Sequence, residues 1–100
     1  PMRIWVYGDS PERIREMIEE NISFDDTVTG TSVCAEIGSV FPQSGLIPAI
    51  SAAIRNDIDL LLVPTFELLG NTAKAKQTIE LFRSYHVSVR SVSSNGINSS

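Results

Sequence analysis

The residues best suited to chemistry stand where apolar runs end. Ser10 follows the run IWVYGD, and Glu67 follows the aliphatic run IDLLLVPTF. A serine hydroxyl becomes a nucleophile when a base and a group that stabilises the developing charge lie beside it. Glu67 comes directly after an expected central strand, on the side of the sheet where functional sites form. Ser10 and Glu67 are therefore the candidate catalytic residues.

A structural role for Ser10 competes with the catalytic one. Ser10 precedes Pro11, and a serine followed by proline is typical of a helix start, with the hydroxyl as N-cap. The Gly-Asp-Ser tripeptide is also similar to that of the Gly-Asp-Ser lipase and esterase family, whose serine works with a late Asp-x-x-His. The chain has one histidine, His86, and Arg83 stands three residues before it, so that triad is absent. We expect His86 to end a helix instead.

Apolar spacing predicts alternating strands and helices. The helix after Ser10 has Ile14, Met17 and Ile18 on one face, and the second has Ile50, Ala53 and Ile54 facing inward. Residues 21–31 are predicted to be a polar turn region. The predicted strands are 2–7, 32–38, 58–66 and 87–92, with Pro64 at the end of the third, and the predicted helices are 11–21, 46–56 and 71–85.

This alternation predicts an α/β fold, with helices on both faces of a four-stranded, mostly parallel sheet. One hundred residues suit a single domain spanning 1–100. Pro1, ahead of Met2, is expected to be an addition to the natural chain, and residues 94–100 to be a frayed tail. No apolar run is long enough to cross a membrane.

The charge and the cysteine content of the chain limit which partners and cofactors we expect. The net charge is −4, and residues 1–30 hold seven acidic residues against three arginines, whereas residues 31–100 are balanced. Domains that bind DNA by themselves are usually basic, so we expect DNA contact only through a missing or separate segment. The single cysteine, Cys34, is expected to be a small apolar side chain on a strand and predicts a reduced, cytoplasmic setting. The sequence has no phosphate-loop or dinucleotide-binding motif, so no cofactor is expected. Asp25 and Asp26, and likewise Asp57 and Asp59, lie in polar turns, so we expect them to be solvated loop charges rather than metal ligands.

Residues 53–92 resemble a second family, different from the Gly-Asp-Ser lipases and esterases. The strand Asp59 to Val63, the following ELLGN and the strand HVSVRSV resemble the middle of the serine recombinase (resolvase/invertase) catalytic domain. MRIWVYGDS stands where that family has a strand ending in Tyr-x-Arg-x-Ser, and SGLIPAISAAI resembles its Arg-Pro/Lys-x-Leu helix start. The resemblance spans about residues 2–97. It implies a resolvase-like fold, a homodimer, and Ser10 as the serine that attacks DNA phosphate.

The arginines that the resemblance requires are missing. Gly8 stands two residues before the serine where the family has arginine, and the spacing there is shorter by one residue. In ELLGN, Glu67 takes the aspartate position, and Leu68 and Asn71 take the two arginine positions. Guanidinium groups suit the binding and neutralisation of a scissile phosphate. The resemblance thus implies a degenerate, non-catalytic interaction or regulatory module linked to DNA recombination, and we expect no enzyme activity.

Two alternatives remain open. The chain could be an active serine recombinase domain that cleaves and rejoins DNA through Ser10, truncated before its DNA-binding segment. It could also be an unrelated small α/β binding domain that holds a small anion at the helix starts after GDS and LGN, where backbone N–H groups are exposed.

Overall fold

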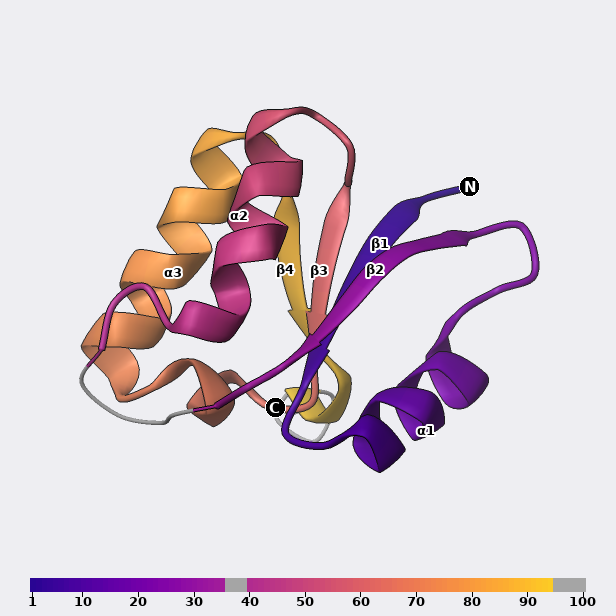
Figure 1. The fold of residues 1–100 in the computed structure, drawn as a ribbon, viewed down its shortest axis with the longest axis horizontal. Coiled ribbons are helices and arrows are strands. Elements are labelled where there is room, and N and C mark those ends of the chain that lie inside the picture. The colour runs from indigo at the N-terminus through magenta and orange to yellow at the C-terminus, as the bar shows by residue number, and fades with distance from the viewer. Residues whose placement is uncertain (36–39, 95–100) are drawn as a thin grey trace.

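The computed structural model describes residues 1–35 and 40–94, which form alternating strands and helices (Figure 1). Short 3-10 turns occupy Ser44–Leu46, Phe66–Leu69 and Val92–Ser94. The main elements are β1 (Arg3–Gly8), α1 (Pro11–Asn21), β2 (Thr27–Val33), α2 (Ile47–Ile54), β3 (Leu60–Val63), α3 (Thr72–Ser84) and β4 (Ser88–Ser91).

The four strands form one sheet in the order β2-β1-β3-β4, and every neighbouring pair is parallel. Helix α1 covers one face, while α2 and α3 cover the other, as Figure 1 shows. The α/β fold with three layers is therefore confirmed, and the sheet is entirely parallel rather than mostly parallel. Parallel strands need crossovers, and each helix supplies one.

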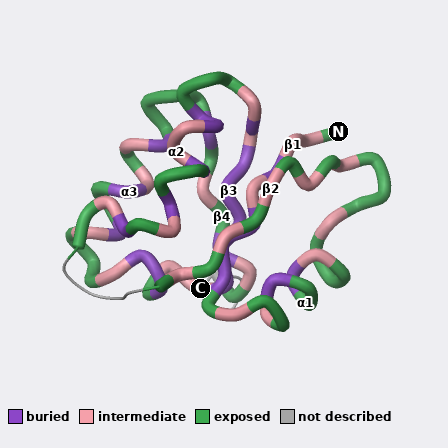
Figure 2. The backbone as a smooth tube through the Cα atoms, viewed as in Figure 1, coloured by how far each residue is buried: buried purple, intermediate pink, exposed green. Residues whose placement is uncertain are grey.

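The alternation of β1 divides the core between the two faces. Ile4 and Val6 pack with Ile14 and Met17 of α1. Tyr7 lies on the opposite face and belongs to the larger cluster beneath α2 and α3. Central strand β3 is buried along its whole length, whereas β2 alternates between exposed and half-buried residues (Figure 2). A strand covered on both faces requires the continuous aliphatic run seen in the sequence.

The second strand was placed wrongly by the sequence pattern. It runs over Thr27–Val33 rather than 32–38, so residues 27–31 of the predicted turn region are strand. Cys34 and Ala35 follow β2 without regular structure, and residues 36–38 of the predicted strand lie outside the described residues. As an edge strand, β2 buries little of its surface. Threonines and Gly30 are therefore tolerated in this strand. The same residue types are common in turns, so the sequence alone, without the pairing to β1, predicted a turn.

The second helix is shorter than predicted, and one of its three predicted inward residues faces outward. It begins at Ile47 after a 3-10 turn and ends at Ile54, which is 57% exposed, so the inward position predicted for Ile54 was wrong. The inward positions predicted for Ile50 and Ala53 are confirmed: Ala53 is buried together with Ala49 and Ala52, and Ile50 is partly buried against the core. Small side chains let this helix lie close to the sheet.

The remaining boundaries agree with the sequence to within three residues. Helix α3 has Asn71 as its N-cap and Tyr85 as its C-cap, and β3 stops before Pro64, as predicted. His86 follows α3 in the left-handed region (φ 66°), and its N–H donates to the Arg83 carbonyl at 2.8 Å. The predicted frayed tail lies outside the described residues from 95 onward.

Candidate functional site

Ser10 lies at the carboxyl end of β1, where it begins α1. Its backbone is extended (φ −157°), and its Oγ accepts a hydrogen bond from the Arg13 N–H at 3.0 Å. Pro11 occupies the first turn, in which a missing N–H removes nothing that the helix needs. The predicted N-cap role of Ser10 is confirmed. Its side chain is half-buried and not sealed from solvent.

Glu67 lies in the 3-10 turn that connects β3 to α3. It is exposed, and its carboxylate forms no hydrogen bond or ion pair with the described residues. Because β1 and β3 are adjacent and parallel, Ser10 and Glu67 leave the sheet at the same edge. Ser10 then leads to α1 on one face and Glu67 leads to α3 on the other, and no hydrogen bond or ion pair joins them. The structure therefore brings them to one edge without making them a catalytic pair.

Three of the six arginines lie far from Ser10. Arg3 begins β1, Arg55 is the C-cap of α2 and Arg83 lies in the last turn of α3, so all three stand at the amino edge of the sheet. The length of a six-residue strand, about 20 Å, separates that edge from Ser10. Arg13, one turn into α1, is the nearest in sequence, and its guanidinium lies 3.5 Å from the Glu16 carboxylate. Among residues 1–35 and 40–94, no arginine side chain forms a hydrogen bond with the Ser10 hydroxyl, which instead accepts from the Arg13 backbone N–H.

A buried polar cluster closes the sheet edge behind Ser10. Tyr7 is fully buried, and its hydroxyl donates to the Gln43 Oε1, which also accepts from the Cys34 Sγ at 3.4 Å. The Gln43 amide donates to the Leu68 carbonyl at 2.9 Å. One glutamine thereby joins the ends of β1 and β2 to the turn after β3. Cys34 lies just after β2 rather than on a strand, and it is half-buried.

Sequence reasoning missed this cluster. Gln43 is only 2% exposed, although glutamine usually lies at the surface. Its partners Tyr7, Leu68 and Cys34 stand 36, 25 and 9 positions away along the chain, so no local spacing connects them. The one available signal was a polar residue between Pro42 and Gly45, and this also suits an ordinary loop.

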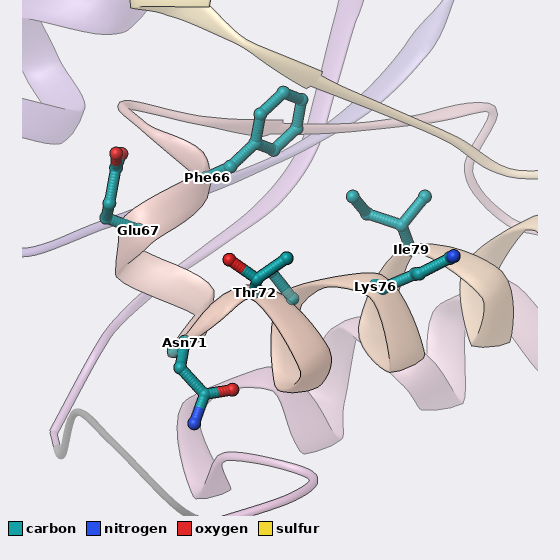
Figure 3. A pocket seen from close by; sticks show the side chains of 8 residues that line it. Phe66, Glu67, Asn71, Thr72, Lys76 and Ile79 are labelled. Carbon is teal, nitrogen blue, oxygen red and sulfur yellow. The ribbon is translucent and has the colours of Figure 1, made fainter.

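A pocket of about 480 Å³ opens beside Glu67, between the turn after β3 and α3. Figure 3 shows Glu67 and Lys76 at opposite ends of it, with Phe66 and Thr72 between them. Its lining residues are Phe66, Glu67, Gly70, Asn71, Thr72, Ala75, Lys76 and Ile79. The Asn71 side chain is engaged as the cap of α3, because its Oδ1 accepts from the Lys74 N–H at 3.0 Å. This pocket is open and mainly apolar, which suits a side chain of a partner better than a phosphate.

An ion pair between Arg3 and Asp59 at the amino edge of the sheet has a structural role. The Arg3 guanidinium contacts both carboxylate oxygens of Asp59, at 2.9 and 3.1 Å. These bonds, together with one from the Arg3 backbone N–H, lower the pKa of Asp59 from its ordinary 3.8 to about 2. The Asp26 carboxylate accepts from the N–H groups of Met2 and Ser23, and its pKa is also lowered. Asp59 and Asp26 are thus bonded within the fold and are not the solvated loop charges expected of them.

Residues 1–35 and 40–94 contain no group of three or more His, Cys, Asp or Glu side chains placed to hold a metal ion. Among the helices of the same segments, none has the length and apolar character needed to span a bilayer.

Comparison with known proteins finds similarity in structure and none in sequence. No family model and no curated protein matches the chain. The C-terminal catalytic domain of ISC1926 TnpA, an IS607-like serine recombinase, matches 90% of the chain with a TM-score of 0.73 and 16% identity. The first open reading frame of transposon ISC1904 from Sulfolobus solfataricus P2 matches 90% with a TM-score of 0.62 and 10% identity. The chain spans about two thirds of each of these, at 67% and 66%. It has the fold of a serine recombinase catalytic domain.

Proposed function

We propose that this chain is a resolvase-like domain without strand-cleaving activity, which serves as an interaction or regulatory module linked to DNA recombination. The proposal rests on the surroundings of Ser10 at the carboxyl edge of the sheet. The hydroxyl caps α1 through the Arg13 N–H, while Arg3, Arg55 and Arg83 lie at the other edge of the sheet.

The physical argument concerns charge. Attack of a serine on a phosphodiester concentrates negative charge on the phosphate oxygens, and fixed cations nearby lower the barrier by several kcal/mol. Arg13 is the one arginine within a helical turn of Ser10 along the chain, and it is shared with Glu16. Asp9, adjacent to Ser10, adds a negative charge that repels a phosphate. A serine in these surroundings lacks both activation and charge neutralisation.

The alternative, an active recombinase domain that uses Ser10, has one observation in its favour. Ser10 is half-buried rather than buried, and it stands at the carboxyl end of β1, where sites of parallel sheets form. A second protomer could supply arginines that this chain lacks.

A covalent trapping experiment separates the two functions. The chain is incubated with negatively supercoiled DNA that carries the sequences flanking its own gene, and protein-bound DNA is collected after denaturation. We expect no adduct from the wild-type chain under conditions in which an active serine recombinase on its own site forms one. An adduct that persists in Ser84→Ala but is lost in Ser10→Ala would establish the alternative. Ser84 is a suitable control because it is exposed and its hydroxyl donates to the Leu81 carbonyl within its own helix.

The partners follow from the same proposal. The module associates as a homodimer and reaches DNA through a separate segment or chain, because the acidic excess of residues 1–30 disfavours direct contact with phosphates. The single cysteine has no second thiol in the chain, which suits a reducing, cytoplasmic setting. Light scattering tests the dimer. DNA binding by this chain alone, with a steep salt dependence, would contradict the second part.

A further inference from the structure

The outer edge of β2 is open to pairing. β2 is the last strand on its side of the sheet, and no other described segment pairs with it. The Cys34 N–H, just beyond β2, donates inward to the Gly8 carbonyl of β1 at 2.8 Å. Because backbone groups alternate along a strand, Thr31 and Val33 direct their N–H and C=O groups outward. These groups form a ready template for another strand.

This edge has few of the features that protect edge strands. Proteins usually shield such edges with short strands, lysine, proline or bulges. β2 has seven residues, five of which are β-branched, and it contains no charged residue and no proline. Its one irregularity, at Thr29, leaves 30–33 in regular register with β1. The opposite edge strand, β4, has four residues and carries Arg90.

A groove of about 560 Å³ runs beside the same edge, between β2 and α1. Ile14, Ile18 and Val33 contribute its apolar lining, and Arg15 and Glu19 contribute charge. Thr31 and Val33 are paired in register with Val6 and Gly8, and Val6 packs with α1, so Thr31 and Val33 face the α1 side of the sheet. A strand added to β2 would therefore place every second side chain over this groove.

The negative charge around the groove favours a basic binding partner over a second copy of the chain. Residues 9–26, which include α1, hold seven acidic residues and two arginines, although the whole chain has a net charge of only −4. Most of these acidic residues are exposed; they include Glu12, Glu16, Glu19 and Glu20. A second copy paired through β2 would bring two such acidic segments together. A basic segment would instead be attracted over about 10 Å at ordinary ionic strength.

We propose that the β2 edge and the α1 groove bind an extended, basic and partly apolar segment of a partner protein by strand addition. Backbone hydrogen bonds to Thr31 and Val33 would provide affinity, and apolar side chains in the groove would provide specificity. This binding surface involves neither Ser10 nor Glu67, so it stands whether or not the chain cleaves DNA.

Peptide titration of the isotope-labelled chain tests the proposal. The probe is Lys-Lys-Val-Thr-Val-Thr-Val-Lys-Lys, and its matched controls replace the lysines with glutamate or the central valine with proline. We expect the probe to shift the amide signals of Thr31 and Val33 and to slow their hydrogen exchange. The glutamate and proline peptides should bind about tenfold more weakly, because each lacks either the charge or the strand pairing.

Two variants test the edge itself. Thr31→Pro removes an outward donor while keeping the ladder to β1, and we expect about tenfold weaker binding, whereas Thr31→Ala stays within about twofold. Glu19→Lys should weaken binding of the lysine probe without altering the strand, and it serves if the proline variant does not fold.

Three results would overturn the proposal: no binding of the lysine probe, signal shifts confined to other elements, or equal binding by Thr31→Pro and Thr31→Ala. Protection of Thr31 and Val33 that grows with protein concentration, without peptide, would identify a second copy as the occupant and reject the basic partner.

Discussion

The N-cap bond of Ser10 yields a quantitative prediction for Ser10→Ala. The Ser10 Oγ accepts from the Arg13 N–H at 3.0 Å at the start of an 11-residue helix. Replacing an N-cap serine by alanine typically costs about 1 kcal/mol, within about 0.5–2 kcal/mol. For a domain of this size, a loss of about 1 kcal/mol lowers Tm by about 4–8 °C. We therefore expect Ser10→Ala to fold but to unfold at a visibly lower urea concentration.

Ser10→Asp is the matched variant. Aspartate keeps an acceptor at the N-cap, and its negative charge interacts favourably with the helix dipole by about 0.3–1 kcal/mol. We expect the free energy of unfolding of Ser10→Asp to stay within about 0.5 kcal/mol of wild type or to exceed it. Both variants remove the hydroxyl, so the comparison separates the structural role of Ser10 from any chemical one.

Urea unfolding at pH 7, followed by the fluorescence of Trp5, measures both variants. Trp5 is the single tryptophan, and its Nε1 donates to the Ser32 Oγ at 2.9 Å, so it reports on the β1–β2 pair. Two results would refute the capping role: Ser10→Ala as stable as wild type, or Ser10→Asp losing as much stability as Ser10→Ala. In either case the Arg13 N–H bond would not be what the helix start requires.

Three further predictions concern packing and charge. Gly30→Ala should destabilise the fold by about 1–3 kcal/mol, because its Cβ would overlap the ring of Trp5; urea unfolding measures the loss. Phe82→Ala should cost about 3–5 kcal/mol, since the Phe82 side chain, on the inward face of α3, is fully buried, and calorimetry measures the fall in Tm. The pKa of Asp59 is lowered to about 2, so its ion pair with Arg3 stabilises the fold above about pH 4 and loses this effect between about pH 4 and 2. Asp59→Asn should therefore lower the free energy of unfolding above about pH 4 and make it fall less as the pH drops from about 4 to 2. The pair is about two fifths exposed, so we expect a contribution of about 1 kcal/mol or less, measured by urea unfolding across that pH range.

Each of the three has a control and a contrary result. Thr29→Ala, at an exposed edge position, should change little, and an equal loss there would contradict the close contact at Gly30. Phe82→Leu should recover most of the stability lost in Phe82→Ala, because it refills much of the cavity. Asp57→Asn is the control for Asp59, since Asp57 pairs with Arg55 on the surface. An unchanged pH profile in Asp59→Asn would show that the Arg3 bonds carry no net stability.

Local signals in the sequence were sufficient for the helix starts and the central strand. Ser10 before Pro11 and Asn71 before Thr72 each predicted a helix start, because a cap bond spans only three residues. The run Leu60–Val63 predicted a strand covered on both faces, because such a strand must be apolar throughout. The α/β fold followed from that alternation.

The candidate site was predicted less well, for a physical reason. The edge strand β2 and the buried partners of Gln43 depend on residues that lie far apart in the sequence. The exposed position of Ile54 likewise could not be predicted from the sequence. It depends on how α2 lies against the sheet, where the buried residues of the helix are alanines.

By itself, the sequence determined the order of the elements, the starts of α1 and α3 and the acidic character of residues 1–30. These features depend on neighbouring residues or on composition alone. Only the tertiary structure decided that Ser10 and Glu67 share an edge without contact, that Gln43 closes that edge, and that β2 is open beside an acidic helix. Those features arise from strand pairing and burial between distant segments, which local residue patterns do not encode.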